Sequence, residues 1–265
     1  MSINRSLQKN EHGSCTLVGA GPGDPELLTV RAVKAIQAAT LLLVDDLVHE
    51  DVVSLARPSA RVVHVGKRGG CKSTPQAFIE RLMIGAVRGG EKVVRLKGGD
   101  PFIFGRGGEE AEHLQAAGIT VCVVNGITAG LAAATALGVP LTHREHAQGA
   151  ILLTGRVRHD IAEPDWKTLA AAACSARLTM VIYMGIGNAA HIQEQLLCGL
   201  PAHTPVAVIQ DATLAGQRHA VCTLDQLQIT IERDDLGSPS VIVVGDVLRG
   251  LMEAKISMPV AQRSA

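Results

Sequence analysis

Residues 94–110 decide the fold, and they read Val94-Arg95-Leu96-Lys97-Gly98-Gly99-Asp100-Pro101-Phe102-Ile103-Phe104-Gly105-Arg106-Gly107-Gly108-Glu109-Glu110. An apolar strand runs directly into a loop with five glycines, one proline and two phenylalanines, and the loop ends in an acidic helix start. Glycines allow positive φ and a close approach of the backbone to a ligand, and an ordinary strand-to-helix turn needs fewer of them. Open α/β sheets bind their ligands in such loops, at the carboxyl ends of their strands. This stretch therefore predicts an α/β sheet with a binding loop.

A second glycine cluster repeats the plan of strand, glycine-rich turn and helix start, in the run Thr16-Leu17-Val18-Gly19-Ala20-Gly21-Pro22-Gly23-Asp24-Pro25-Glu26-Leu27-Leu28-Thr29. It does not fit the dinucleotide fingerprint G-x-G-x-x-G, because Asp24 stands where the last glycine is required. Pro22 stands where helical amide groups should face a pyrophosphate, and no Gly-Lys-Ser/Thr ending follows. We predict that this loop meets a ligand, but not through a phosphate.

Composition excludes several classes of function. The chain has 265 residues with 25 Lys plus Arg and 25 Asp plus Glu, so no net field draws it to nucleic acid or to an anionic membrane. Few aromatic residues are present to stack on single-stranded bases. No apolar run is long enough to span a bilayer, and the first 13 residues lack the apolar core of a signal peptide. Six scattered cysteines without a C-x-x-C pair argue against a zinc or disulfide framework, so we expect no metal and a cytoplasmic location.

Short apolar runs alternate with segments of helical periodicity, which predicts α/β architecture with mainly parallel pairing. The expected strands are 15–18, 41–44, 61–65, 92–96, 121–124, 151–154, 179–183, 206–209 and 241–244, and the expected helices are 25–39, 75–88, 107–117 and 127–137. A polar run over 142–149 follows a glycine-proline turn and suggests a domain boundary. We therefore expect two α/β domains, at 14–145 and 146–250, flanked by tails at 1–13 and 251–265.

The order of the motifs resembles that of the tetrapyrrole methylases. The resemblance covers residues 14–250 and rests on the two glycine loops, Gly66-Lys67-Arg68, Gly126-Ile127-Thr128-Ala129, Pro140-Leu141-Thr142-His143-Arg144, Tyr183-Met184-Gly185 and Ile242-Val243-Val244-Gly245. It implies two α/β domains with the active site in the cleft between them, usually in a homodimer. It also implies transfer of two methyl groups from S-adenosylmethionine to uroporphyrinogen III at carbons 2 and 7. Precorrin-1 is then the intermediate, precorrin-2 the product, and S-adenosylhomocysteine the spent cofactor.

The resemblance assigns roles to particular residues. Asp45 corresponds to the proposed proton acceptor and Lys67 to the proposed proton donor, and Arg106 completes the catalytic set. The residues that correspond to cofactor contacts are Pro22, Gly98, Gly99, Asp100, Ile103, Thr128, Ala129, Met184 and Ala212. The eight carboxylates of the substrate require local positive charge, for which Arg68, Lys72, His143, Arg144 and Arg156 are candidates.

Simpler interpretations of these residues stay open. Asp45 also suits a helix cap or a surface acid, and neighbouring Asp46 competes for its role. Lys67 also suits a carboxylate anchor, Thr128–Ala129 a plain helix start, and Met184 a core position. Each cation taken singly is also explained as a solvated surface charge.

Several positions depart from the family pattern. Asn125 stands where proline is usual before Gly-Ile-Thr, which predicts a looser turn. Glu145-His146 stands for Asp-Tyr, whereas Lys72 and Arg156 each replace a histidine and strengthen a site for carboxylates. These changes cluster on the substrate side, so they bear on the choice of tetrapyrrole rather than on the cofactor.

The rival functions are a sister methylase acting on a later corrinoid precursor, a dinucleotide-dependent oxidoreductase and a non-catalytic binding module. The missing fingerprint disfavours the oxidoreductase, and the intact Asp45, Lys67 and Arg106 disfavour the binding module. About 13 residues precede the first strand, so we expect no fused dehydrogenase-chelatase module. The sequence leaves open whether the product feeds sirohaem, cobalamin or haem d1.

Overall fold

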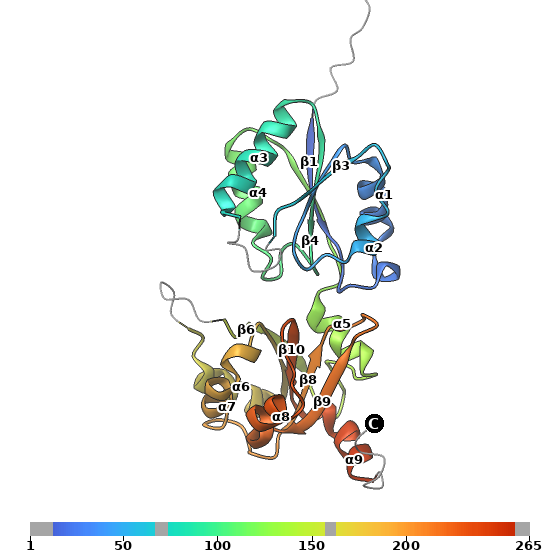
Figure 1. Ribbon diagram of the computed structural model, residues 1–265. Coiled ribbons are helices and arrows are strands. Elements are labelled where there is room, and N and C mark those ends of the chain that lie inside the picture. The colour runs from blue at the N-terminus through green and yellow to red at the C-terminus, as the bar shows by residue number, and fades with distance from the viewer. Residues whose placement is uncertain (1–12, 67–73, 157–162, 258–265) are drawn as a thin grey trace, which may run out of the picture. The chain divides into compact units, whose positions relative to one another are not determined.

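The chain forms two compact units, Met1–Thr128 and Ala129–Ala265, each built around a five-stranded sheet (Figure 1). The computed structural model describes residues 13–66, 74–156 and 163–257. Helices cover both sheets, so the predicted α/β class with two domains is confirmed. Every strand predicted from the sequence is present, to within a few residues at its ends.

The sheet of the first unit is entirely parallel in the order β3-β2-β4-β1-β5. Its elements, in chain order, are β1 (Ser14–Gly19), the 3-10 helix η1 (Pro25–Leu27), α1 (Val30–Ala38), β2 (Leu41–Val44), α2 (Glu50–Val53), β3 (Arg61–His64), α3 (Gln76–Arg88), β4 (Lys92–Lys97), α4 (Gly107–Ala116) and β5 (Val121–Val124). The single helix expected over 25–39 is split, because the Thr29 Oγ1 accepts a hydrogen bond from the Ala32 N–H and starts α1 afresh.

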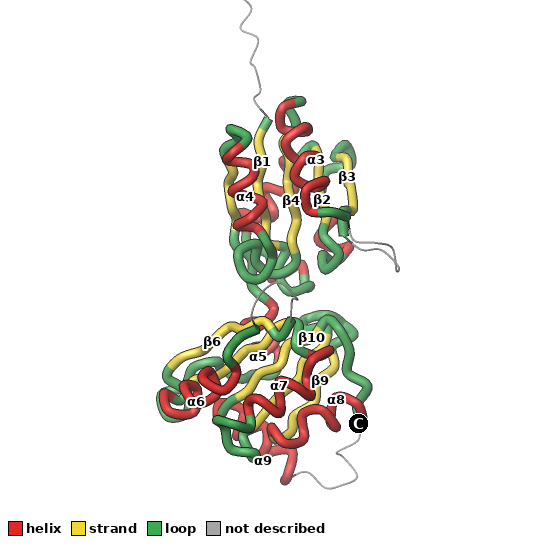
Figure 2. The backbone as a smooth tube through the Cα atoms, turned by 90° about the vertical axis from the view of Figure 1, so that its left-hand side faces the viewer, coloured by secondary structure: helices red, strands yellow, loops and turns green. Residues whose placement is uncertain are grey.

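Helices lie on both faces of this sheet, with α1 and α2 on one side and α3 and α4 on the other (Figure 1). Figure 2 shows the sheet from the side of α3 and α4. Leu41 and Leu43 of β2 pack in the core on the α3 and α4 side, whereas Leu42 and Val44 pack in the core on the α1 and α2 side. A strand buried on both faces has no polar side, which explains why β2 is apolar throughout. The carboxyl ends of the parallel strands meet at one edge, where the loops after β1, β2, β4 and β5 lie.

The sheet of the second unit is mixed, in the order β6-β7-β10-β8-β9. Only β6 and β7 pair in parallel, and the pairs β7–β10, β10–β8 and β8–β9 are antiparallel. The expectation of mainly parallel pairing is therefore wrong for this half. The elements are α5 (Ala129–Ala136), β6 (Gly149–Thr154), α6 (Trp166–Ala176), β7 (Leu178–Tyr183), η2 (Ile186–Asn188), α7 (Ala189–Leu196), β8 (Pro205–Gln210), β9 (Arg218–Thr223), η3 (Leu224–Gln226), α8 (Leu227–Arg233), β10 (Ser240–Val244), η4 (Asp246–Leu248) and α9 (Arg249–Ser257).

Helix α5 belongs to the second unit, so the units divide at Thr128/Ala129 rather than at the expected 145/146. Its Gly130 N–H donates a hydrogen bond of 3.0 Å to the Tyr183 hydroxyl on β7. A side chain at Gly130 would overlap that hydroxyl, so the small residue lets the helix lie directly on the strand. The opposite face of the sheet packs against α6, α7 and α8 around Met180, Ile182 and Ile192. Among the described residues, no helix is both long and apolar enough to cross a membrane.

Candidate active site

The two glycine-rich loops of the first unit are joined to each other. The Gly99 N–H donates to the Gly21 carbonyl oxygen at 2.7 Å, and the Gly21 N–H donates to the Gly99 carbonyl oxygen at 3.2 Å. Both residues have positive φ, +70° at Gly21 and +66° at Gly99, which favours glycine. The loops after β1 and β4 therefore form one continuous backbone surface, with the predicted cofactor contact Pro22 on one loop and Gly98, Gly99 and Ile103 on the other.

The loop after β5 lies against this pair. An added Cβ at Gly126 would overlap the Gly99 carbonyl oxygen, and one at Gly19 would overlap the Gly126 nitrogen. The glycines at these two positions are thus required by the contact between the three loops themselves. Both a contact between loops and a bound ligand can require glycine, so glycine enrichment alone does not show which of the two is the cause.

Asp100 holds the same loops together. Its Oδ1 accepts a hydrogen bond from the Phe102 N–H at 2.8 Å. Its Oδ2 accepts one from Asn125 Nδ2 and one from the Gly126 N–H, each at 3.1 Å. The expectation that Asn125 loosens the turn is therefore wrong, because its side-chain amide supplies a tether that proline cannot. Asp100 is 7% exposed, so most of its hydrogen-bonding capacity is directed to its own loops.

Beyond Asp100 the β4–α4 loop turns outward. Phe102 and Phe104 are 53% and 41% exposed, and Phe104 and Arg106 both have positive φ. The Arg106 Nη2 lies 2.6 Å from the Glu109 Oε2, and these hydrogen bonds raise the pKa of Arg106. Pro101, Phe102, Arg106, Gly107, Gly108 and Glu109 line a shallow cavity of about 280 Å³. The Arg106 guanidinium and the exposed Phe102 ring therefore flank an open pocket.

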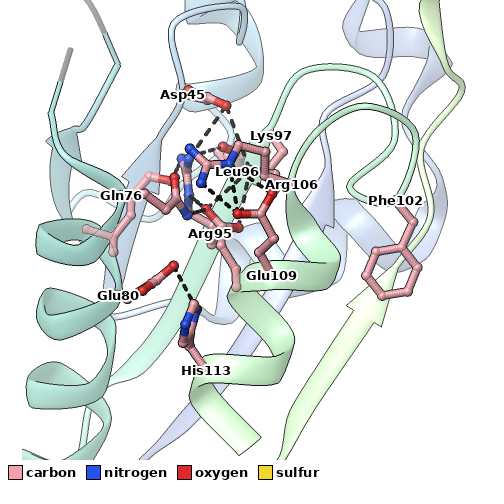
Figure 3. A network of polar contacts seen from close by, with 12 residues as sticks. Asp45, Gln76, Glu80, Arg95, Leu96, Lys97, Phe102, Arg106, Glu109 and His113 are labelled. Atoms are coloured by element: carbon pink, nitrogen blue, oxygen red, sulfur yellow. Dashed lines mark hydrogen bonds and ion pairs between the residues drawn. The ribbon is translucent and has the colours of Figure 1, made fainter. Parts of the chain in front are cut away.

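Asp45, the predicted base, follows β2 and lies beside two buried cations (Figure 3). Its Oδ2 is 3.5 Å from Arg95 Nη2 and 3.9 Å from Lys97 Nζ. The Asp45 side chain is 35% exposed, whereas those of Arg95 and Lys97 are 2% and 3% exposed. One side of the carboxylate thus contacts the protein interior, and the rest stays accessible. The carboxylate of Asp46 is not part of this network, and its backbone N–H donates to the Asp45 Oδ1 at 3.1 Å.

A fully buried carboxylate balances the two cations. Glu110 on α4 lies 3.1 Å from Arg95 Nε and 3.2 Å from Lys97 Nζ, and it accepts a hydrogen bond of 3.0 Å from Gln76 Nε2. Two cations and two carboxylates therefore form one network at the carboxyl end of the sheet (Figure 3). Burial and the charge of Arg95 lower the pKa of Lys97, while Glu110 and Asp45 oppose that change.

Sequence reasoning missed Arg95, Lys97 and Glu110. A signal was present, because Arg95 and Lys97 are two residues apart on a strand whose other residues after Lys92 are apolar, and hence they point to the same face of the sheet. Charges at such positions of a central parallel strand are costly unless they are paired. The partner on α4 could not be inferred without the packing of that helix.

The second unit holds the other predicted residues. Met184 follows β7 and is 43% exposed, and Ala212 follows β8 and is buried. His143 and Arg144 lie in a turn that lines a cavity of about 380 Å³ with Thr142, Ala147 and Gln148. The N–H of Arg156 donates to Thr154 Oγ1 just after β6, and Ala129 begins α5. Lys67, Arg68 and Lys72 lie outside the described residues, and Thr128 is buried at the end of the first unit.

Strained backbone collects in the predicted functional loops of both units. Among the described residues, seven non-glycine residues have positive φ, and Phe104, Arg106, Met184, Asp211 and Thr213 are five of them. All five lie within two residues of a predicted catalytic or cofactor position or occupy one. Such conformations cost about 1–3 kcal/mol each and gather at functional sites. This feature points to the same loops as the motifs do, and it is independent of them.

Residues 14–228 match the family model of the Tetrapyrrole (Corrin/Porphyrin) Methylases. The chain therefore belongs to this family, as the motifs predict. Among curated proteins, it is 50% identical over 247 residues to the uroporphyrinogen-III C-methyltransferase of Pseudomonas aeruginosa, a match that covers 93% of this chain and 98% of that one. It is 48% identical to siroheme synthase 2 of Aeromonas hydrophila over 91% of this chain, but this match spans only 50% of that longer protein.

Solved structures agree with this assignment. The uroporphyrin-III C-methyltransferase of Thermus thermophilus in complex with S-adenosylhomocysteine is 38% identical, with a TM-score of 0.76 over 90% of this chain and 100% of that one. A cobalt precorrin-4 methyltransferase of cobalamin biosynthesis is 27% identical, with a TM-score of 0.79 over 91% of this chain and 98% of that one. The fold is thus shared by relatives that act on different tetrapyrroles.

Proposed function

We propose that this chain catalyses the S-adenosylmethionine-dependent C-methylation of uroporphyrinogen III. The reaction adds methyl groups at carbons 2 and 7 and gives precorrin-2 by way of precorrin-1. The observation that carries the proposal is the 50% identity to the Pseudomonas uroporphyrinogen-III C-methyltransferase along nearly the whole length of both chains. The Thermus relative with bound S-adenosylhomocysteine supports the choice of cofactor.

The loops of the first unit suit such a cofactor. Pro22, Gly98, Gly99 and Ile103 are only partly buried, so backbone and aliphatic surface are accessible on one connected pair of loops. Glycine at positions 98 and 99 keeps that surface free of side chains, which permits close approach of a bent ligand. Bound S-adenosylmethionine supplies an electrophilic methyl group, and the task of the protein is then to align it with a pyrrole carbon and exclude water. In this proposal Met184 and Ala212 complete the cofactor site, and Thr128 and Ala129 contribute at the start of α5.

Asp45 accepts the proton that carbon methylation releases from the pyrrole system. Its partly exposed carboxylate is held by Arg95 and Lys97 on its buried side, which fixes its direction without occupying its accessible side. Lys67 remains the predicted proton donor, although it lies outside the described residues. Arg106, on a strained and exposed loop position, provides a guanidinium for substrate or for developing charge.

The substrate's carboxylates require cations that are exposed rather than buried. His143, Arg144 and Arg156 are exposed, as is Arg106. Arg68 and Lys72 join them as proposed ligands on sequence grounds alone. This function also predicts a homodimer located in the cytoplasm.

A sister methylase of a later corrinoid precursor is the second candidate. It is favoured by the TM-score of 0.79 to the cobalt precorrin-4 methyltransferase, which exceeds the 0.76 to the Thermus relative. The lower sequence identity, 27% against 38%, weighs against it. The two candidates share the cofactor and differ only in the tetrapyrrole.

An anaerobic incubation with S-adenosylmethionine and fresh uroporphyrinogen III, followed by mass spectrometry and absorbance, tests the proposal. We expect a gain of two methyl groups. Cofactor binding without methylation of uroporphyrinogen III would favour the sister methylase. Absence of cofactor binding would refute both candidates.

Two variants test the assigned residues. Asp45→Asn should lose turnover while its affinity for S-adenosylmethionine stays near that of the wild type, because the carboxylate acts on the substrate. Gly99→Val should lose cofactor binding, because a branched side chain at φ +66° both strains and fills the loop. Gly85→Ala is the matched control, since a Cβ there meets nothing within 4 Å. If Asp45→Asn turned over substrate at the wild-type rate, Asp45 would not be the proton acceptor.

A further inference from the structure

The turn between α5 and β6 carries a second concentration of ligand-type side chains. One ligand atom from each of His143, Glu145 and His146 lies within 4.8 Å of the other two. All three residues belong to the run His143-Arg144-Glu145-His146-Ala147, which sequence reasoning treated as part of a polar domain boundary. Two imidazoles and a carboxylate are a set that divalent transition metals accept.

The backbone of this turn is held in place. The His143 N–H donates to the Ala147 carbonyl oxygen at 2.8 Å, and the Ala147 N–H returns a bond to the His143 carbonyl oxygen at 2.9 Å. Arg177 Nη1, from the end of α6, donates to the Glu145 carbonyl oxygen at 3.1 Å. The three side chains therefore project from a closed loop and not from a free segment, which lowers the entropic cost of bringing them together.

The two imidazole rings are already close and nearly parallel. Their centroids are 4.6 Å apart with 20° between the planes. Ligands of one metal ion at about 2.1 Å lie roughly 3.0–3.5 Å from each other, so modest rotations of these side chains are needed. The Glu145 N–H currently donates to His143 Nδ1 at 3.2 Å. Giving up this bond to water costs about 0.5–1.5 kcal/mol, which is small beside the gain from metal–imidazole bonds.

We propose that His143, Glu145 and His146 bind one divalent transition-metal ion of the zinc or nickel type. Three protein ligands leave coordination positions open, as in sites where a metal also meets a carboxylate or water. Arg144 lies in the same turn, and its positive charge opposes a bare cation but favours a metal that carries an anionic outer ligand.

The test is a calorimetric titration of the untagged, EDTA-treated full chain with ZnCl2 and separately with NiCl2. We expect one site per chain, and at least about tenfold weaker binding in each of His143→Ala, His146→Ala and Glu145→Gln. His203→Ala is the control, because it removes an exposed histidine of the same unit that lies outside the cluster. Added Co²⁺ should give a ligand-field absorption band in the wild type and lose it in His146→Ala.

Wild-type affinity for the metal in the three cluster variants would show that the metal binds elsewhere and would overturn the proposal. The absence of saturable binding at millimolar metal would also overturn it. Unchanged circular dichroism and Trp166 fluorescence in the variants would show that lost binding is not lost folding. None of these measurements depends on the methylation reaction, so the result stands whatever the tetrapyrrole substrate is.

Discussion

Replacing Glu110 by glutamine tests the buried charge network. Glutamine keeps the size of the side chain and one acceptor oxygen but removes the charge that faces Arg95 Nε at 3.1 Å and Lys97 Nζ at 3.2 Å. Glu110 is fully buried, and the side chains of both cations are at most 3% exposed. Removing one partner of a buried ion pair leaves an uncompensated charge and costs about 3–5 kcal/mol. We therefore expect a loss of that size in the free energy of unfolding.

The assay is equilibrium unfolding in urea, followed by circular dichroism. With a slope near 2 kcal/mol per molar urea, the expected loss moves the midpoint of the affected transition down by about 1.5–2.5 M. Trp166 is the only tryptophan of the chain and lies in the second unit, so its fluorescence reports on that unit separately. The largest shift should therefore appear in the part of the circular dichroism transition that comes from the first unit, which Trp166 fluorescence does not report.

Glu109→Gln is the matched control. Glu109 is adjacent in sequence and pairs with Arg106, but these side chains are 49% and 51% exposed. An exposed pair contributes about 0–1 kcal/mol. Equal midpoints for the two variants would refute the reasoning, because Glu110 would then be no more important than a surface acid. A Lys97→Met, Glu110→Gln double variant should lose less than the sum of the single losses, since it removes one charge of each sign.

Three further predictions follow from local contacts. Burial raises the pKa of the Cys15 thiol from 9.0 to about 12, so between pH 9 and 12 this thiol ionises only in the unfolded chain, and stability falls by up to about 1.4 kcal/mol per pH unit. The difference in unfolding free energy between wild type and Cys15→Ala should therefore shrink over that range. A constant difference would contradict this prediction. Tyr183→Phe removes the acceptor of the Gly130 N–H and should cost about 1–2 kcal/mol, measured by Trp166 fluorescence in urea; an unchanged midpoint would mean that water replaces the hydroxyl. Gly85→Ala, at an exposed position of α3 with free space for a Cβ, should stabilise the chain by about 0.5–1 kcal/mol in thermal unfolding, and a loss of stability would reveal a hidden contact.

Local patterns in the sequence located all but one of the strands, and the exception is instructive. β9 has the sequence Arg218–Thr223, with polar residues at its start and only a short apolar stretch, so it lacks the run that marked the others. It forms a strand because β8 offers it an antiparallel edge. The direction of pairing in the second sheet escaped prediction for a similar reason, because alternation of strands and helices suggests parallel order but does not require it.

The candidate site shows the same division between local and tertiary information. Glycines, the carboxylate after β2 and the cations after other strands could be found from the sequence, because each depends on its position at a strand end. The hydrogen bonds between Gly21 and Gly99 and from Asn125 to Asp100 could not, because they join residues far apart in the chain.

The sequence by itself determined the family, the two α/β domains and the glycine-rich loops at the strand ends, since these follow from periodicity and from the order of short motifs. Tertiary structure alone decided that α5 belongs to the second unit, that the second sheet is mixed, and that Glu110 pairs with Arg95 and Lys97 beside Asp45. The physical reason is that backbone propensity and strand periodicity act over a few neighbouring residues. Charge pairing, loop contact and strand direction are set instead by which elements pack together.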